Sequence, residues 1–144
     1  MTQSILGNIS AEDFLSNYWQ KKPLLIRGAI PNFEAPIDGD ELAGLALEPE
    51  VESRLVVSDK WTLEHGPFDE NRFSTLPPSH WTLLVQAVDL WVPEVGALMK
   101  HFDFLPPWRI DDIMVSYAED GGSVGPHFDY YDVFLLQGVG QRRW

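Results

Sequence analysis

Two residues near the end of this 144-residue chain have the types and the spacing of metal ligands. His127 and Asp129 are separated only by Phe128. If this segment is a β-strand, side chains two positions apart point to the same face of it. One imidazole and one carboxylate are two of the three ligands in the facial triad of non-heme Fe(II) oxygenases. The pair is therefore a candidate iron site, although a turn aspartate beside a hydrogen-bonded histidine would give the same pattern.

Three features of the surrounding sequence favour a ligand site at this pair. The glycine-rich segment 121–126 would let the backbone approach a bound ligand closely. Residues 132–137 form an apolar run that predicts a buried strand and a dry wall for the site. Arg142 and Arg143 follow a tight glycine turn, and because adjacent strand residues face opposite ways, only one of them can point inward. A buried arginine needs an anion, which a dicarboxylate would supply.

Three helices are predicted upstream from their caps and stops. Ser10 is a helix N-cap with Asp13 at the third helical position, and this helix ends before Pro23. Residues 38–47 form a second helix that begins at an aspartate. A third helix over 92–102 has a proline in its first turn, where proline is well tolerated.

Short apolar or alternating stretches between turn residues predict strands. These stretches are residues 23–28, 51–58, 60–65, 80–88, 113–118 and 132–137. The second and third of them form a hairpin with its turn at residues 59–60. Asp111 and Asp112 are either a metal pair or, alternatively, capping and turn residues. The whole pattern indicates an α+β fold whose helices and strands lead into a double-stranded β-helix, or jelly roll.

Composition limits the function further. The chain is strongly acidic, with a formal charge of −12, so binding to a nucleic-acid phosphate backbone is not expected, whereas a basic protein would be attracted. It has no cysteine, so a metal must be held by histidine, carboxylate or water. The sequence begins without the pattern of a signal peptide and has no apolar run of about 18 residues, so we expect a soluble, cytoplasmic protein without membrane contact.

Several blocks of the sequence together are far more specific than the His-x-Asp pair alone. They are WRIDD at 108–112, GPHFDYYDVF at 125–134 and QGVGQRRW at 137–144, with further similarity at 14–23, 40–46 and 83–88. These blocks resemble the bacterial ribosomal oxygenases, which are JmjC-type, cupin-like hydroxylases dependent on Fe(II) and 2-oxoglutarate. The resemblance covers nearly all of this chain but only the first part of a family member.

The resemblance implies a site and a reaction. His127 and Asp129 would be the first two iron ligands, Arg142 would bind the distal carboxylate of the cosubstrate 2-oxoglutarate, and Ser116 would line the cosubstrate or substrate pocket. The reaction would be hydroxylation of an arginine side chain in a large-subunit ribosomal protein, a basic partner that suits the acidic chain. Residues 1–144 would then be the N-terminal part of one JmjC/cupin-like domain. Its lead-in would be 1–109, and 110–144 would be the first barrel strands, so that the chain is truncated within the barrel.

The same resemblance implies that parts of the enzyme lie outside this sequence. The family's second histidine ligand would follow Trp144, as would the region through which family members form homodimers. We therefore expect the isolated 144-residue chain to be inactive. Two other readings remain open: a non-catalytic cupin-like module that binds a basic peptide, and a jelly-roll dioxygenase or isomerase of small molecules. Iron content and 2-oxoglutarate consumption distinguish a ribosomal oxygenase from the binding module. Reaction with a basic ribosomal peptide distinguishes it from the small-molecule enzyme.

Overall fold

The computed structural model describes residues 4–144, which form two compact units. One unit consists of Pro36–Ala97 and Asp111–Phe128, and we call it the sheet unit. The other consists of residues 4–35 together with Leu98–Ile110 and Asp129–Trp144, and we call it the aromatic unit. Each unit is assembled from separate stretches of chain. The predicted division at residue 109 into a lead-in and first barrel strands stays a prediction.

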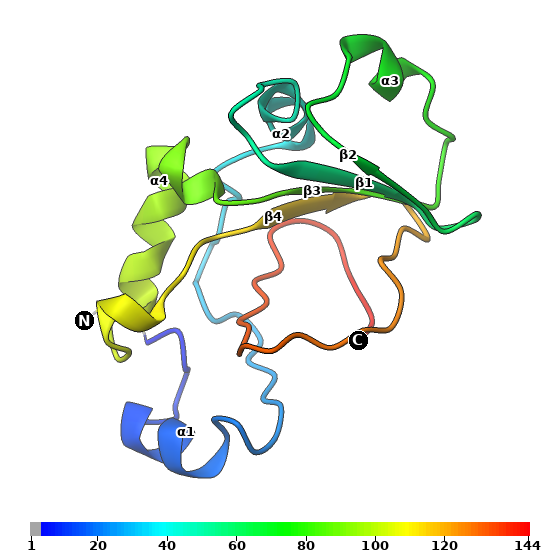
Figure 1. Cartoon of the computed structure of the whole chain (residues 1–144). Helices are drawn as coiled ribbons and strands as arrows, with labels where there is room; N and C mark the ends of the chain where they lie inside the picture. Colours follow the sequence, from blue (N-terminus) through cyan, green and yellow to red (C-terminus); the bar gives the residue numbers. More distant parts are fainter. Residues whose placement is uncertain (1–3) are drawn as a thin grey trace. The chain divides into compact units, whose positions relative to one another are not determined.

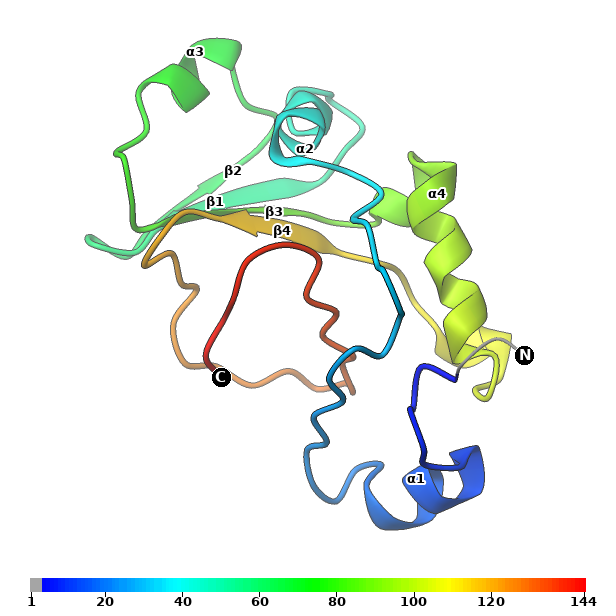
Figure 2. The same ribbon diagram turned by 180° about the vertical axis from the view of Figure 1, so that it is seen from behind.

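An antiparallel sheet of four strands in the order β2-β1-β3-β4 forms the centre of the sheet unit (Figures 1 and 2). Its strands are β1 (Ser53–Val57), β2 (Thr62–His65), β3 (Trp81–Val85) and β4 (Val115–Ala118). The predicted hairpin is confirmed, because β1 pairs with β2 from Val57 opposite Thr62 to Arg54 opposite His65. Strand β3 then pairs with β1 on one side and with β4 on the other.

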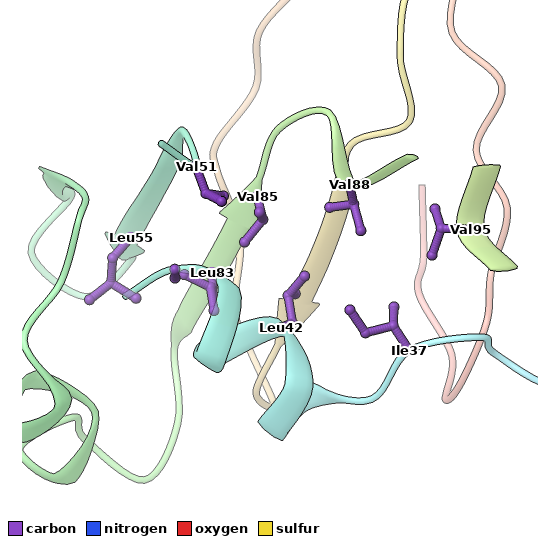
Figure 3. Close-up of a cluster of buried hydrophobic side chains, with 9 residues drawn as sticks. Ile37, Leu42, Val51, Leu55, Leu83, Val85, Val88 and Val95 are labelled. Carbon is purple, nitrogen blue, oxygen red and sulfur yellow. The ribbon is translucent and has the colours of Figure 1, made fainter. Parts of the chain in front are cut away.

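Helix α2 (Gly39–Leu45) packs its apolar side against one face of this sheet (Figure 3). Asp38 is its N-cap and accepts a hydrogen bond from the Glu41 amide at 2.8 Å, which is why the helix begins where the sequence predicts. Leu42 is fully buried against alternate residues of the strands, since side chains two apart share a face. The other buried residues of this core are Ile37, Ala46, Val51, Leu55, Leu83, Val85, Val88 and Val95.

Shorter helical segments connect the strands. Helix α3 (Glu70–Ser74), which the sequence analysis did not predict, follows β2. After β3 come η1 (Val88–Leu90) and α4 (Pro93–Gly96), with Pro93 in the first turn as predicted. The chain continues as the 3-10 helices η2 (Ala97–Phe102) and η3 (Pro107–Arg109) before it reaches β4.

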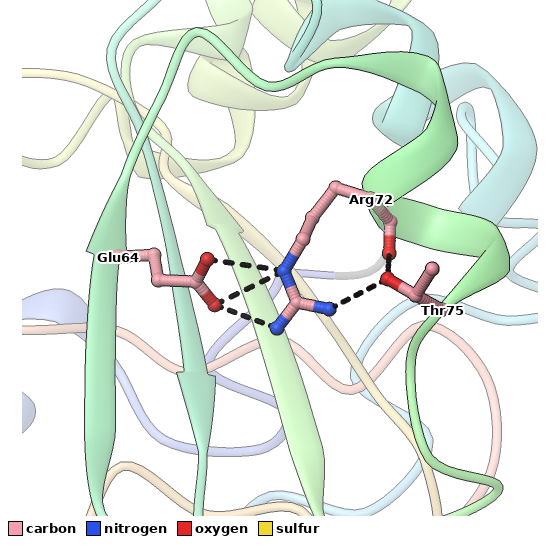
Figure 4. Close-up of polar contacts among 3 residues, drawn as sticks. All are labelled: Glu64, Arg72 and Thr75. Atoms are coloured by element: carbon pink, nitrogen blue, oxygen red, sulfur yellow. Dashed lines mark hydrogen bonds and ion pairs between the residues drawn. The ribbon is translucent and has the colours of Figure 1, made fainter.

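An ion pair attaches α3 to strand β2 (Figure 4). The Arg72 guanidinium donates through Nε and Nη2 to the Glu64 carboxylate, with the shortest bond at 2.7 Å, and through Nη1 to the Thr75 hydroxyl. The hydrogen bonds from Arg72 hold the pKa of Glu64 below its usual value. A carboxyl group with a lowered pKa in the folded state stabilises the fold above its unfolded-state pKa, and this stabilisation is lost as the pH falls through the folded-state pKa.

We expect Glu64→Gln to lower the free energy of unfolding slightly near neutral pH. Because both side chains are partly exposed, the loss should stay below about 1 kcal/mol. The difference from the unsubstituted chain should shrink as the pH falls through the folded-state pKa of Glu64, because below it the carboxyl group is protonated in both states. Urea unfolding at pH values on both sides of that pKa measures this difference, with exposed Glu48→Gln as the control. A deficit that does not change with pH would contradict the assignment.

The aromatic unit is built around Phe14 of helix α1 (Ala11–Asn17). Ser10 is the N-cap of this helix and accepts from the Asp13 amide at 3.0 Å, so the predicted start is confirmed. The rings of Trp19 and Phe104 lie 5.9 and 5.8 Å from that of Phe14, centroid to centroid. Burial of Ile5, Leu6 and Phe14 completes a small core.

Two predicted strands are wrong. Residues 23–28 and 132–137 are irregular chain in the structure, and 132–137 are exposed rather than buried. Both stretches have the composition of strands, but a strand also needs a neighbour for its backbone hydrogen bonds, and none in residues 4–144 pairs with either. Phe134 instead packs its ring within the aromatic unit, with its centroid 4.7 Å from that of the Phe102 ring.

Candidate functional site

A tight turn after β4 leads the chain toward His127. The Glu119 amide donates to the Trp81 carbonyl at 3.1 Å, and the His80 amide donates to the Asp120 carbonyl at 2.8 Å. The Gly122 amide donates to the Glu119 carbonyl at 2.7 Å and closes the turn. A Cβ atom on Gly122 would lie 2.8 Å from the Glu119 carbonyl oxygen and closer still to that of Trp81. Any larger residue at this position would force these backbone atoms to shift, so Gly122 sets the course of the chain at the start of the segment.

Gly125 makes the second turn of this approach. Its φ of +81° lies in the left-handed region that favours glycine, and its amide donates to the Ser123 hydroxyl at 3.0 Å. The ring of Trp61, from the β1–β2 turn, covers it so closely that a Cβ on Gly125 would lie 3.1 Å from the ring. The sequence analysis recognised the glycines but missed Trp61, because residues 61 and 125 meet only through the fold.

The His127 side chain is exposed and hydrogen-bonded to the same turn. Its Nδ1 lies 3.1 Å from the Gly125 carbonyl oxygen, which can only accept, so Nδ1 carries the proton. The lone pair of the neutral ring is then on Nε2. Metal-binding histidines have this arrangement, in which one ring nitrogen donates to a carbonyl or carboxylate and the other binds the ion.

Asp129 is the first residue of the last segment of the aromatic unit, so the boundary between the two units falls between Phe128 and Asp129. The Asp129 side chain is exposed. The expectation that His127 and Asp129 lie on one β-strand is wrong, because residues 123–129 are irregular and no strand within 4–144 pairs with them. In the described part of the chain, no three His, Asp or Glu side chains are grouped closely enough to hold a metal ion.

The two predicted cosubstrate residues lie in different units. Ser116 is an exposed residue of β4, opposite Leu84 of β3, and shares with it the face of the sheet that α2 does not cover. Arg142 belongs to the aromatic unit and is exposed, with its guanidinium carbon 5.6 Å from the centroid of the Trp144 ring. Arg143 is exposed as well, so neither arginine is buried as the sequence predicted. A buried side chain needs a packed wall, which the irregular 132–137 segment does not form.

Of the two aspartates before β4, Asp112 has the capping and turn role and positions that strand. Its Oδ2 accepts from the Ala87 amide at 2.8 Å and from the Gln86 side-chain amide at 2.9 Å. Asp89, which follows β3, bonds in return to the residues before β4 and accepts from the Ile113 amide at 2.9 Å. The sequence analysis missed Asp89. These bonds hold the end of β3 to the start of β4, and thereby hold Ser116 in its register.

Comparisons with known proteins agree with the sequence resemblance. Residues 97–144 match the family model of the JmjC domain. The chain is 52% identical over 134 residues to the ribosomal protein uL16 3-hydroxylase of Escherichia coli (strain K12), covering 92% of this chain and 35% of that protein. It is 47% identical over 140 residues to a probable ribosomal oxygenase of Haemophilus influenzae, covering 95% of this chain and 34% of the relative. The chain thus spans about a third of the length of these curated relatives.

A solved structure shows the same fold. The chain superposes on YcfD, a ribosomal oxygenase from Escherichia coli in complex with cobalt and 2-oxoglutarate, with a TM-score of 0.80 and 48% sequence identity. The match covers 85% of this chain and 34% of the other. It confirms the expected α+β class, in which helices and an antiparallel sheet form part of a JmjC, cupin-like protein.

Proposed function

We infer, from a chain that matches the JmjC-type ribosomal oxygenases over nearly its whole length, that it is part of a 2-oxoglutarate-dependent protein hydroxylase. The observation that carries this inference is the position of His127. It lies within the JmjC-matching residues 97–144, and its Nδ1 donates to the Gly125 carbonyl, as the ring nitrogen opposite the metal does in metal-binding histidines.

We propose that His127 Nε2 and the Asp129 carboxylate are two ligands of an Fe(II) ion. The donor set fits this metal, since an imidazole and a carboxylate form most of the facial triad of non-heme iron oxygenases. Both side chains are exposed. When bound, Fe(II) would supply the activation of dioxygen that hydroxylation needs. The third ligand would be a histidine beyond Trp144 in a longer protein.

We propose that Arg142 binds the distal carboxylate of 2-oxoglutarate and that Ser116 lines the cosubstrate or substrate pocket. A guanidinium can donate two parallel hydrogen bonds to one carboxylate, which suits Arg142 to this role. The Ser116 hydroxyl lies on the sheet face that α2 leaves uncovered, so it can donate to a ligand there. The relative whose solved complex contains cobalt and 2-oxoglutarate supports a metal beside this cosubstrate.

We expect Arg142→Ala in the longer protein to weaken the use of 2-oxoglutarate. Removing a charged bidentate contact should raise its KM at least about tenfold, with a smaller change in kcat, because hydrogen bonds to charged groups contribute about 1.5–3 kcal/mol. Succinate formation at varied 2-oxoglutarate concentration measures both constants. Arg143→Ala is the matched control and should leave the KM within about twofold. A raised KM in Arg143→Ala together with an unchanged KM in Arg142→Ala would assign the role to Arg143.

The proposed substrate is an arginine side chain in a large-subunit ribosomal protein. The formal charge of −12 favours such a basic partner and disfavours direct contact with nucleic acid. A ribosomal substrate would place the protein in the cytoplasm. We also propose that the longer protein is a homodimer, as the resemblance to the ribosomal oxygenases implies. None of the helices formed by residues 4–144 has the length and apolarity of a membrane span.

One experiment tests this function. The longer protein is incubated with Fe(II), 2-oxoglutarate and separated large-subunit ribosomal proteins, and succinate and the mass of each protein are measured. We expect one ribosomal protein to gain a single oxygen atom on an arginine, dependent on both Fe(II) and 2-oxoglutarate. The 144-residue chain alone should give no succinate. Peptide binding without 2-oxoglutarate consumption would instead indicate a non-catalytic binding module.

A further inference from the structure

A pocket of about 440 Å³ opens in the sheet unit, on the side of the sheet that α2 covers. Trp81 of β3 and Tyr117 of β4 form one wall, with their ring centroids 5.6 Å apart. Ser116, the neighbour of Tyr117 on β4, faces the other side of the sheet, because adjacent strand residues point in opposite directions. The pocket is therefore separate from the proposed cosubstrate residue. Its lining also includes Asp38, Gly39, Asp40 and Glu119.

The aromatic wall is held in place by its surroundings. The Trp81 indole Nε1 donates to the Pro77 carbonyl at 2.9 Å, which fixes the plane of the ring. The Tyr117 ring packs on Gly39, where a Cβ atom would lie 2.8 Å from it. The Tyr117 hydroxyl donates to Glu119 Oε1 at 2.8 Å, so the ring and the carboxylate position one another. A ligand would find these groups already arranged, which reduces the entropy lost on binding.

Negative charge surrounds the aromatic wall. Three carboxylates, those of Asp38, Asp40 and Glu119, line the pocket, and none of the lysines or arginines within residues 4–144 lines it. The hydrogen bond to Glu119 raises the pKa of Tyr117 above its usual value, and burial and the charges of Glu119, Asp40 and Asp120 raise it further. A planar cation is the ligand that suits both features, because guanidinium stacks on aromatic rings and pairs with carboxylates.

We propose that this pocket binds an arginine side chain of a basic protein partner, with the guanidinium against Trp81 and Tyr117 and paired with Asp40 and Glu119. The inference rests on the proposed function in identifying the partner as the basic ribosomal substrate. It adds a docking point on the far side of the sheet from Ser116. The pocket thus holds the partner without taking part in the reaction.

Binding of a fluorescein-labelled arginine-rich peptide to the 144-residue chain tests the proposal, by fluorescence anisotropy at about 0.15 M salt. The double substitution Asp40→Asn with Glu119→Gln should raise the dissociation constant at least about tenfold, since it removes both charged partners. The control, Glu48→Gln with Glu50→Gln, changes the net charge by the same amount on an exposed surface outside the pocket. It should change the dissociation constant less than about twofold. A peptide with citrulline in place of arginine should bind to the unsubstituted chain as weakly as the arginine-rich peptide binds to the Asp40→Asn, Glu119→Gln variant.

Each outcome decides the proposal. Equal weakening by the two double variants would show that only the overall charge attracts the peptide, and would overturn it. Absence of binding to the unsubstituted chain, with circular dichroism showing that the chain is folded, would overturn it as well. Neither result depends on iron or on 2-oxoglutarate turnover, so the proposed function stands or fails separately in the hydroxylation assay. A lysine-for-arginine peptide that binds equally well would overturn the assignment to guanidinium.

Discussion

Replacing His127 by alanine in the longer protein should abolish 2-oxoglutarate-dependent hydroxylation. The imidazole is proposed as one of only three protein ligands, so its removal should cost more than the roughly 10–100-fold loss that follows mutation of groups behind a ligand. We therefore expect succinate formation to fall at least about 100-fold. Iron content measured on the purified variant should fall as well. These two readouts distinguish a lost ligand from a lost proton-transfer group, which would leave iron in place.

Asp129→Ala should give the same result, and His65→Ala provides the control. His65 ends strand β2, and its side chain is exposed. Its replacement should leave both iron content and turnover within about twofold of the original, as expected for a surface substitution. Full iron occupancy together with normal turnover in His127→Ala would remove the basis for the proposed metal site.

Replacing Gly122 by alanine should destabilise the sheet unit strongly. The added Cβ would meet the carbonyl oxygens of Glu119 and Trp81, and both are backbone atoms held by hydrogen bonds. The turn must therefore open or shift, and because overpacking of this kind typically costs 1–3 kcal/mol, we expect a loss of about 3 kcal/mol. Urea unfolding of the 144-residue chain measures this loss.

Gly44→Ala is the matched control for this turn. Gly44 lies inside helix α2, and a Cβ there would meet nothing within 4 Å. Because alanine favours a helix over glycine, the chain should become more stable by about 0.5–1 kcal/mol. The two substitutions add the same methyl group, so their opposite signs would isolate the effect of crowding at the turn. A neutral Gly122→Ala would show that the turn has room to relax.

The elements that the sequence analysis predicted well are those that depend on nearby residues. Ser10 and Asp38 cap their helices through amides three residues ahead, and the β1–β2 hairpin closes over a short turn. The strands predicted at 23–28 and 132–137 failed because a strand requires a partner that its own residues do not specify. Helix α3 was missed because it is short and depends on the Arg72–Glu64 pair for its attachment.

The sequence by itself determined the chemistry available to this protein: an imidazole and a carboxylate two residues apart, a nearby guanidinium and an acidic surface that suits a basic partner. Residue types and short spacings suffice for that, because they set which atoms can bind a metal or an anion. The tertiary structure alone decided how the His127 ring is oriented and that Trp81, Tyr117 and Glu119 enclose a pocket. Such positions depend on packing between residues far apart in the chain, such as Trp61 on Gly125, and composition carries no record of these contacts.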